Sequence, residues 1–473
     1  MRAPASRTAC LSSSLVYKAA QGPEYTETMV VVMSDSLDTL LLLSSEPDFQ
    51  GQLARLRADL LAAARLAGPD SEQNRTVARI LNDIEQRGDL AVAEYTRKFD
   101  GVELEAAQFR VGADELRAAH DGIDRDLLTA LRRAIANVRA YQEKIFIGRA
   151  SEFSNGTGIR YTPIRRVGVC VPGAAAPLPS TVIMTVVPAQ VAGVSDIAVV
   201  SPPRHEGSIH PVILGVCQEL GVPEIYRIGG IQAVGALARG TQTIPLVDMI
   251  VGPGNSWVQA AKRSVAGDCV RIDSIAGPSE VLILANSEAR PAWVAADMLS
   301  QAEHAADSSA IVLTDSEPMA RAILGALTEQ LETLPRAAEA AVSLRRFSRV
   351  IVLKNMEEAV RLADEFASEH LEVQCGRRSR EIAGRITNAG AIFIGPVTPV
   401  AVGDYWAGPS HTLPTGSRAK FSSAVTSNDF VKSISLIEYT TEQLAEAADD
   451  IIRMAEAEGL TAHARSISIR RST

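Results

Sequence analysis

Imidazole and carboxylate side chains gather toward the C-terminal part of this 473-residue chain. Four of its seven histidines lie past residue 300, several of them beside carboxylates or glycines. Gln301 and His304 close a helix expected over residues 291–304, and positions three apart lie on one helical face. These two side chains could therefore face one metal ion. A polar helix end in water is the alternative interpretation.

A carboxylate and another imidazole could complete such a site. Asp404 follows a glycine in a loop expected after the strand at residues 391–394, where it suits a hard or borderline cation or simply forms a turn. His463 follows the C-terminal helix. With Gln301 and His304, the set offers one carboxamide, two imidazoles and one carboxylate. This set suits Zn²⁺, although manganese or cobalt would also be accepted, and the missing thiolates favour a catalytic site over a structural one.

Glu369 and His370 form a second candidate pair. They stand where a helical pattern over residues 356–367 gives way to a strand pattern over residues 371–373. A carboxylate and an imidazole at such a junction can act as base and water activator near neutral pH. The alternative is a charged helix end at which His370 only complements the helix dipole.

The composition and net charge of the chain exclude several classes of protein. A net charge of −9 without a long Lys/Arg cluster argues against nucleic-acid binding, and no apolar run approaches the roughly 20 residues of a membrane helix. The five cysteines contain no C-x-x-C pair, so neither a disulfide framework nor a thiolate zinc site is indicated. We expect a soluble, cytoplasmic protein that acts on a small molecule.

The elements that must position these residues have an α/β pattern. Residues 49–141 are helical in character, and short β-rich runs then alternate with helical patterns. This alternation predicts right-handed β-α-β units and two lobes with parallel sheets. The strands are expected at residues 167–171, 197–200, 225–228 and 249–251, and at residues 281–284, 310–313, 350–353 and 391–394. An amphipathic helix over residues 441–459 precedes a short tail.

Glycines mark the carboxyl ends of the first set of strands, where α/β folds bind cofactors. They occur at Gly173, at Gly229 and Gly230, and in the run at residues 252–255, Gly-Pro-Gly-Asn. That run opens an expected helix over residues 256–266, whose amides could hold an anion or a nucleotide. It is not a G-x-G-x-x-G motif, so as a general nucleotide signal it is weak.

Read in order, the motifs resemble the histidinol dehydrogenase family from about residue 70 to the C-terminus. Many short motifs in one order make coincidence implausible. They are Val171-Pro172-Gly173, Gly229-Gly230-Ile231-Gln232-Ala233, Gly252-Pro253-Gly254-Asn255, Ala276-Gly277-Pro278-Ser279-Glu280-Val281, Ser300-Gln301-Ala302-Glu303-His304, Glu369-His370-Leu371, Gly403-Asp404-Tyr405, His411-Thr412-Leu413-Pro414-Thr415 and Leu460-Thr461-Ala462-His463.

The resemblance implies a role for each matching residue. Glu369 and His370 match the catalytic pair, and Gln301, His304 and Asp404 match zinc ligands that are completed by His463 from a partner subunit. The positions that match substrate contacts are Ser279, Gln301, His304, His370, Asp404, His411, Glu458 and His463. Cys170, Gln232 and Asn255 match dinucleotide contacts. Two positions depart from the family pattern, Cys170 for a tyrosine and Ala174 for a glycine, and both put NAD affinity or binding pose in question.

The resemblance also implies an architecture of two incomplete Rossmann-like lobes, similar to aldehyde dehydrogenases, with terminal segments that interlock a homodimer. We expect residues 1–33 to be an extension, disordered or ahead of a later start codon, and residues 34–70 to be an N-terminal helical segment. Residues 71–150 and 280–425 would form a substrate and zinc lobe, and residues 151–279 a dinucleotide-binding lobe. Residues 426–473 would form the C-terminal helix and tail that reach the partner.

The function that the resemblance implies is the zinc-dependent oxidation of L-histidinol through L-histidinal to L-histidine with two NAD, which is the last step of histidine biosynthesis. It also implies one Zn²⁺ per subunit and active sites shared across the dimer. A paralogous NAD-dependent dehydrogenase of another small alcohol, such as sulfopropanediol, is the nearest alternative. A sulfonate would favour Arg or Lys where Glu458 and His463 stand. A zinc hydrolase would leave Gln232 and Asn255 without a role, and the Glu369–His370 pair argues against a silent scaffold protein.

Overall fold

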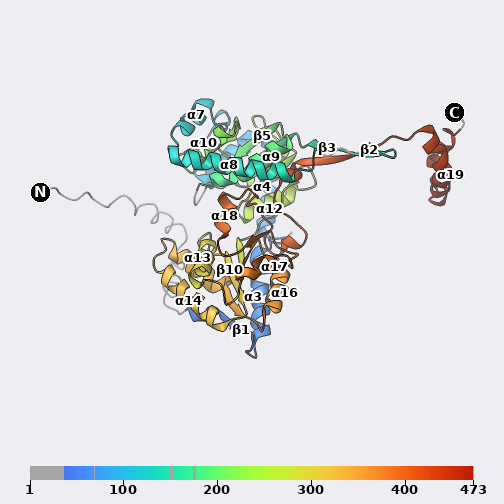
Figure 1. Cartoon of the computed structure of the whole chain (residues 1–473). Helices are drawn as coiled ribbons and strands as arrows, with labels where there is room; N and C mark the ends of the chain where they lie inside the picture. Colours follow the sequence, from blue (N-terminus) through green and yellow to red (C-terminus); the bar gives the residue numbers. More distant parts are fainter. Residues whose placement is uncertain (1–36, 69, 150–152, 174–176, 472–473) are drawn as a thin grey trace.

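Two parallel sheets form the frame of the molecule (Figure 1). The computed structural model describes residues 37–68, 70–149, 153–173 and 177–471, so the extension at residues 1–33 and Ala174 lie outside the described residues. The six-stranded sheet has the order β1 (Leu41–Leu43), β11 (Arg349–Val352), β10 (Ser309–Thr314), β9 (Glu280–Ala285), β12 (His370–Gln374) and β13 (Ala391–Ile394). The five-stranded sheet has the order β6 (Glu224–Tyr226), β5 (Asp196–Val200), β4 (Arg166–Cys170), β7 (Met249–Val251) and β8 (Arg271–Ile272).

Helices cover both faces of each sheet, which explains why the strands are nearly continuous apolar runs. On the five-stranded sheet, one apolar core involves α4 (Glu72–Arg87), α5 (Asp89–Asp100), α11 (Gly230–Arg239) and α12 (Ser256–Val265). The core on its other face involves α7 (Ala113–Asp121), α8 (Arg125–Ile145), α9 (Pro179–Ala192) and α10 (Pro211–Glu219). Among the described residues, no helix combines the length and apolarity needed to cross a membrane. The expectation of an α/β fold with parallel sheets is confirmed.

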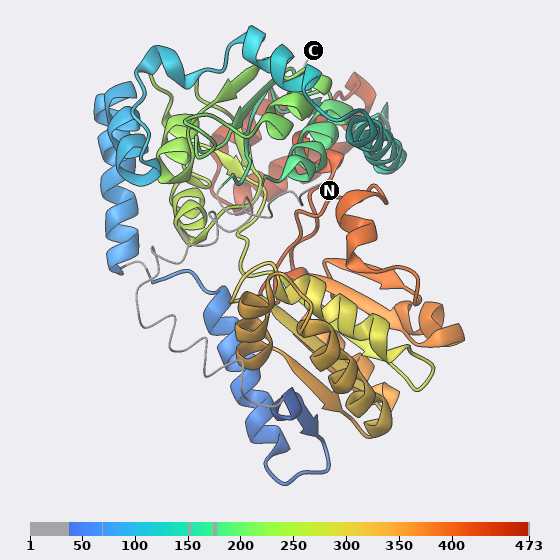
Figure 2. The same ribbon diagram turned by 90° about the vertical axis from the view of Figure 1, so that its left-hand side faces the viewer.

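The six-stranded sheet is covered in the same way. On one face lie η1 (Leu37–Leu40), α13 (Pro291–Ala302), α14 (Glu317–Leu331) and α15 (Ala337–Phe347), and on the other lie α3 (Phe49–Ala64), α16 (Met356–Phe366) and α17 (Ser379–Ala383). Figure 2 shows α3 in the lower lobe, beside the yellow and orange segments that follow it by more than two hundred residues in the sequence. This lobe is therefore built from two distant parts of the chain.

The placement of residues 71–150 differs from the expected assignment to the substrate and zinc lobe. Their helices pack on the five-stranded sheet instead, where Val77, Ile80 and Ile84 of α4 share a core with α11, and Val138 of α8 shares a core with α9. The physical reason is that an amphipathic helix pattern identifies a buried face but not the sheet that buries it.

An antiparallel arm projects from the five-stranded lobe. It consists of β2 (Phe153–Ser154), β3 (Thr157–Pro163) and β14 (Val431–Ile437), with the register Val431↔Pro163 to Ile437↔Thr157. Beyond it lie α19 (Thr441–Ala457) and α20 (Thr461–Ser468), and Figure 1 shows α19 and the C-terminus apart from both lobes. The stretch expected as a tail after residue 459 is thus a second short helix.

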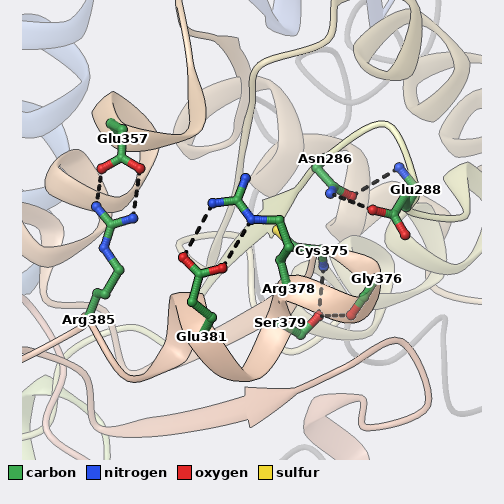
Figure 3. A network of polar contacts seen from close by, with 9 residues as sticks. All are labelled: Asn286, Glu288, Glu357, Cys375, Gly376, Arg378, Ser379, Glu381 and Arg385. Carbon is green, nitrogen blue, oxygen red and sulfur yellow. Dashed lines mark hydrogen bonds and ion pairs between the residues drawn. The ribbon is translucent and has the colours of Figure 1, made fainter.

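A network of polar contacts closes the carboxyl ends of β9 and β12 (Figure 3). The Cys375 amide donates to Ser379 Oγ at 3.0 Å, and Arg378 pairs with Glu381 at 3.2 Å. Arg385 and Glu357 form another ion pair there. The catalytic candidates lie at the opposite, amino end of β12, which begins at His370.

Candidate active site

The backbone of Glu280 holds the candidate catalytic pair in place. Glu280 is the first residue of β9, and its amide donates to Glu369 Oε2 at 2.9 Å. Its carbonyl oxygen lies 3.0 Å from His370 Nδ1. Because a carbonyl only accepts hydrogen bonds, this contact places the ring proton on Nδ1. His370 Nε2 is buried and has no hydrogen-bond partner, so its lone pair is free to accept a proton.

Burial controls the charge of both members of the pair. It raises the pKa of Glu369 well above the usual value, and the Glu280 and Asp404 carboxylates raise it further. The pKa of His370 is lowered to about 4, first by burial and also by His304 and His411. His370 is therefore a neutral imidazole at neutral pH, the form that a general base requires.

Asp404 and His411 lie beside this pair. Asp404 Oδ1 is 3.9 Å from His370 Nε2, and burial raises the pKa of Asp404 to about 7. Burial lowers the pKa of His411 to about 4, despite a hydrogen bond to the Asp404 backbone. Asp404 was expected in a loop, and the structure places it in α18 (Val400–Tyr405), a short helix after β13.

Gln301 lies in the last turn of α13 and His304 follows that helix at the surface. The Gln301 residue is 1% exposed, and neither its Oε1 nor its Nε2 has a hydrogen-bond partner. A buried carboxamide without partners costs about 1–3 kcal/mol, so this side chain is suited to a ligand. The influence of His304 on the pKa values of His370 and His411 shows that α13 ends near the catalytic pair.

The structure brings some of the expected residues together and leaves others apart. Ser279 directly precedes β9, where its carbonyl accepts from the Ser309 amide at 3.0 Å. Glu458 caps the end of α19 and His463 lies on α20, and both are exposed on the far side of the arm. Among the described residues, no three His, Cys, Asp or Glu side chains are close enough to hold a metal ion.

A cavity of about 390 Å³ lies at the carboxyl ends of β4, β5 and β7, and Cys170, Gln232 and Asn255 all line it. Gln232 donates from Nε2 to Asp100 at 3.1 Å, while its Oε1 is buried without a partner. Burial raises the pKa of the Cys170 thiol to about 12, so this cysteine stays protonated. It contributes a small, uncharged side chain to the cavity wall.

Asn255 has a structural task in the same cavity. Its Oδ1 accepts hydrogen bonds from the Trp257 and Val258 amides, both at 3.1 Å, and so caps α12. The backbone amides at the start of this helix were expected to be available for an anion. Those of Trp257 and Val258 already donate to Asn255, so the group of the Asn255 side chain that remains for a ligand is its amide nitrogen.

Lys262 and Asp273 form a buried ion pair under this loop, and sequence reasoning missed them. Both side chains are 1% exposed. Lys262 donates to the Gly252 carbonyl at 2.9 Å, and Asp273 Oδ2 accepts from the Gly252 amide at 2.7 Å. Gly252 has φ +106°, and a Cβ there would lie 2.2 Å from the Cys170 carbonyl oxygen. The pair therefore fixes a glycine turn at the cavity wall. The one sequence signal for this pair was that Lys262 lies on the apolar face of the helix expected over residues 256–266.

Replacing Lys262 with methionine should lower the free energy of unfolding by about 3–5 kcal/mol, because Asp273 would remain buried without its partner. Urea unfolding followed by circular dichroism would measure the loss. The exposed Lys354→Met variant is the matched control and should unfold like the unmodified chain. Equal midpoints for the two variants would contradict a structural role for the ion pair.

The fold and the site together define the class of protein as an α/β dehydrogenase with two lobes. One lobe has a glycine-lined cavity at the ends of its strands, and the other has a buried acid–histidine pair. Comparison with known proteins agrees. The model of the family described as histidinol dehydrogenase matches residues 64–471. The chain therefore belongs to the histidinol dehydrogenase family, an oxidoreductase family, which confirms the resemblance seen in the motifs.

Relatives match over nearly their full lengths. The chain is 43% identical over 422 residues to histidinol dehydrogenase of Geobacillus kaustophilus, covering 89% of this chain and 99% of that one. It is 45% identical over 404 residues to that of Heliobacterium mobile, covering 85% and 94%. The crystal structure of histidinol dehydrogenase from Elizabethkingia anophelis superposes with a TM-score of 0.83 at 36% identity, over 91% of this chain and 97% of that one.

Proposed function

We propose that the protein oxidises L-histidinol through L-histidinal to L-histidine, with hydride transferred to NAD in each of two steps, as the last reaction of histidine biosynthesis in the cytoplasm. The observation that carries this proposal is the buried, neutral His370, whose Nε2 has no hydrogen-bond partner and lies 3.9 Å from Asp404 Oδ1, while Glu369 Oε2 lies 3.7 Å from Nδ1. An imidazole in that state can take a proton from an alcohol.

In the first step, His370 Nε2 accepts the hydroxyl proton while the carbon-bound hydrogen leaves as hydride to NAD, giving the aldehyde. In the second step, Glu369 removes a proton from water as the oxygen adds to the aldehyde carbon, and His370 returns the proton that it gained in the first step to the former aldehyde oxygen. The hydrate then loses a hydride to a second NAD, with His370 again accepting the hydroxyl proton. The cavity lined by Gln232, Asn255 and Cys170 would hold the dinucleotide.

The residues present fit a zinc ion. Gln301 offers a buried carboxamide with no other partner, and the set of amide, imidazole and carboxylate donors suits Zn²⁺. Gln301, His304 and Asp404 would hold it together with the partner subunit's His463. The ion would supply a fixed anchor for the amino group and imidazole of the substrate, and such positioning lowers the entropic barrier.

A homodimer with shared sites follows from the same assignment. His463 and Glu458 lie beyond the arm and are exposed, as are the large apolar side chains Ile437, Met454 and Ile469. A partner subunit would cover this apolar surface and receive both polar residues in its own site. Ser279 and His411 would then contact the substrate from the opposite side.

The decisive experiment is an assay of purified protein with histidinol and NAD, followed by NADH absorbance. We expect two NADH for each histidinol. EDTA should abolish turnover, and added Zn²⁺ should restore it. Circular dichroism should change little after EDTA, because the four ligands come from helix ends and a C-terminal segment rather than from a core. Turnover that survives complete metal removal, or global unfolding on metal loss, would contradict the zinc assignment.

A further inference from the structure

Two carboxyl groups lie directly behind the proposed active site. Glu372, on β12, is 1% exposed, and its carboxyl group lies beside that of Asp297 on α13. Gln374 Nε2 donates to both groups, at 2.8 Å to Glu372 and 2.7 Å to Asp297. Because one amide nitrogen contacts an oxygen of each group, the two carboxyl groups are close neighbours, and the repulsion between two negative charges favours holding one proton between them. Burial first, and the neighbouring Asp297 next, raise the pKa of Glu372 to about 9.

The pair contacts two of the elements that carry the proposed active-site residues. Asp297 stands one helical turn before Gln301 on α13, so both lie on the same side of that helix. Glu372 stands two residues after His370 on β12, so both side chains point to the same face of the sheet. The carboxyl pair thus joins the helix of Gln301 to the strand of His370.

The second carboxyl oxygen of Glu372, Oε1, holds the third element, α18. Glu372 Oε1 accepts from the Val400 amide at 2.9 Å. Val400 is the first residue of α18, and Asp404 follows one turn later in the same helix. One side chain therefore connects β12 with both α13 and α18.

We propose that Asp297 and Glu372 are positioning residues that hold α13, β12 and α18 at the separation at which Gln301, Asp404 and His370 meet metal and substrate. The proposal rests on the proposed function. The proton held between the two carboxyl groups contributes to this positioning, because two neighbouring charged carboxylates would push α13 and β12 apart. Neither residue touches substrate, so their effect passes through the three groups that they place.

Glu372→Gln and Glu372→Ala separate this role from simple core packing. A glutamine still accepts from Val400 and donates to Asp297, and the Gln374 amide can turn so that its unpartnered Oε1 accepts from the new NH2 group. Its Zn²⁺ affinity and kcat should therefore stay near those of the unmodified enzyme. The alanine variant should lose about 10- to 100-fold in Zn²⁺ affinity, measured by calorimetric titration of the metal-free protein, and should lose kcat in parallel. The KM for NAD should not change, because the dinucleotide cavity lies in the other lobe. Asp297→Ala should repeat the alanine result if Glu372→Ala does not fold.

Asp364→Ala is the matched control. This carboxylate lies on α16, across the sheet from α13, and accepts from the Thr387 and Asn388 amides at 2.7 and 2.8 Å. Its loss should lower the melting temperature without changing Zn²⁺ affinity. The proposal is overturned if Glu372→Gln is as impaired as Glu372→Ala, or if the alanine variants lose only thermal stability. If the unmodified enzyme does not oxidise histidinol, the proposed function fails, while the Zn²⁺ titrations still report on positioning.

Discussion

Mixing two inactive variants, His463→Ala and His304→Ala, should restore about a quarter of the unmodified activity once subunits exchange. Random exchange makes half of the dimers mixed. In each mixed dimer, one site carries both lesions and the other carries neither, provided that His463 acts in the partner's site. The exposed position of His463 on α20, beyond the arm, is the structural reason to expect this arrangement.

The measurement is NADH formation from histidinol after the variants have been denatured and refolded together, with exchange verified by mass spectrometry of differently tagged subunits. Each variant refolded alone is the control and should remain inactive. If each subunit builds its own site, every site keeps one lesion. Absent activity despite proven exchange would therefore exclude shared sites and the placement of the C-terminal segment on the partner.

Replacing Glu369 with glutamine should slow aldehyde oxidation by about 10²- to 10⁴-fold, the usual contribution of a general base. Oxidation of the alcohol should fall much less, because only the second step needs an activated water. The raised pKa of Glu369 adds a pH dependence: its carboxylate form increases as pH rises toward that pKa, so aldehyde oxidation by the unmodified enzyme should increase with pH. Glu369→Gln should lose this increase.

Single-turnover assays on histidinol and on histidinal across a pH series would test both parts. Glu365→Gln is a suitable control, because Glu365 is an exposed acid that pairs with Arg57 at 2.9 Å. Equal losses on the two substrates would assign Glu369 to orientation of His370 rather than to activation of water.

The sequence predicted most strands of both sheets, because strands buried on two faces are continuous apolar runs. It missed β8, and it also missed β1, which lies in the segment at residues 34–70 that was expected to be helical. Residues 249–251 and 391–394 were predicted with the observed bounds. It could not reveal the arm, in which β3 and β14 pair across more than 260 residues and carry no matching pattern. Nor could it assign α4 and α8 to a sheet, since their apolar faces fit either one.

The candidate site was predictable only through the order of its motifs. Alone, Gln301 and Asp404 are ordinary polar residues, and nothing in their local sequence shows that the Gln301 carboxamide is buried without a partner. Lys262 and Asp273, and likewise Asp297 and Glu372, were missed because charged residues are usually found at the surface. Their burial depends on contacts between distant elements, which no local pattern contains.

The discontinuous six-stranded lobe also has a consequence for synthesis on the ribosome. Strand β1 pairs with β11 in the register Leu41↔Val350, so it has no neighbour in its sheet until some three hundred later residues have been translated. At about 5–20 residues per second, this takes roughly 15–60 s, during which the five-stranded lobe between them can fold first. The apolar Leu40 and Leu42 remain uncovered in that interval. Nascent chains should therefore depend on chaperones that bind short apolar segments until β11 emerges.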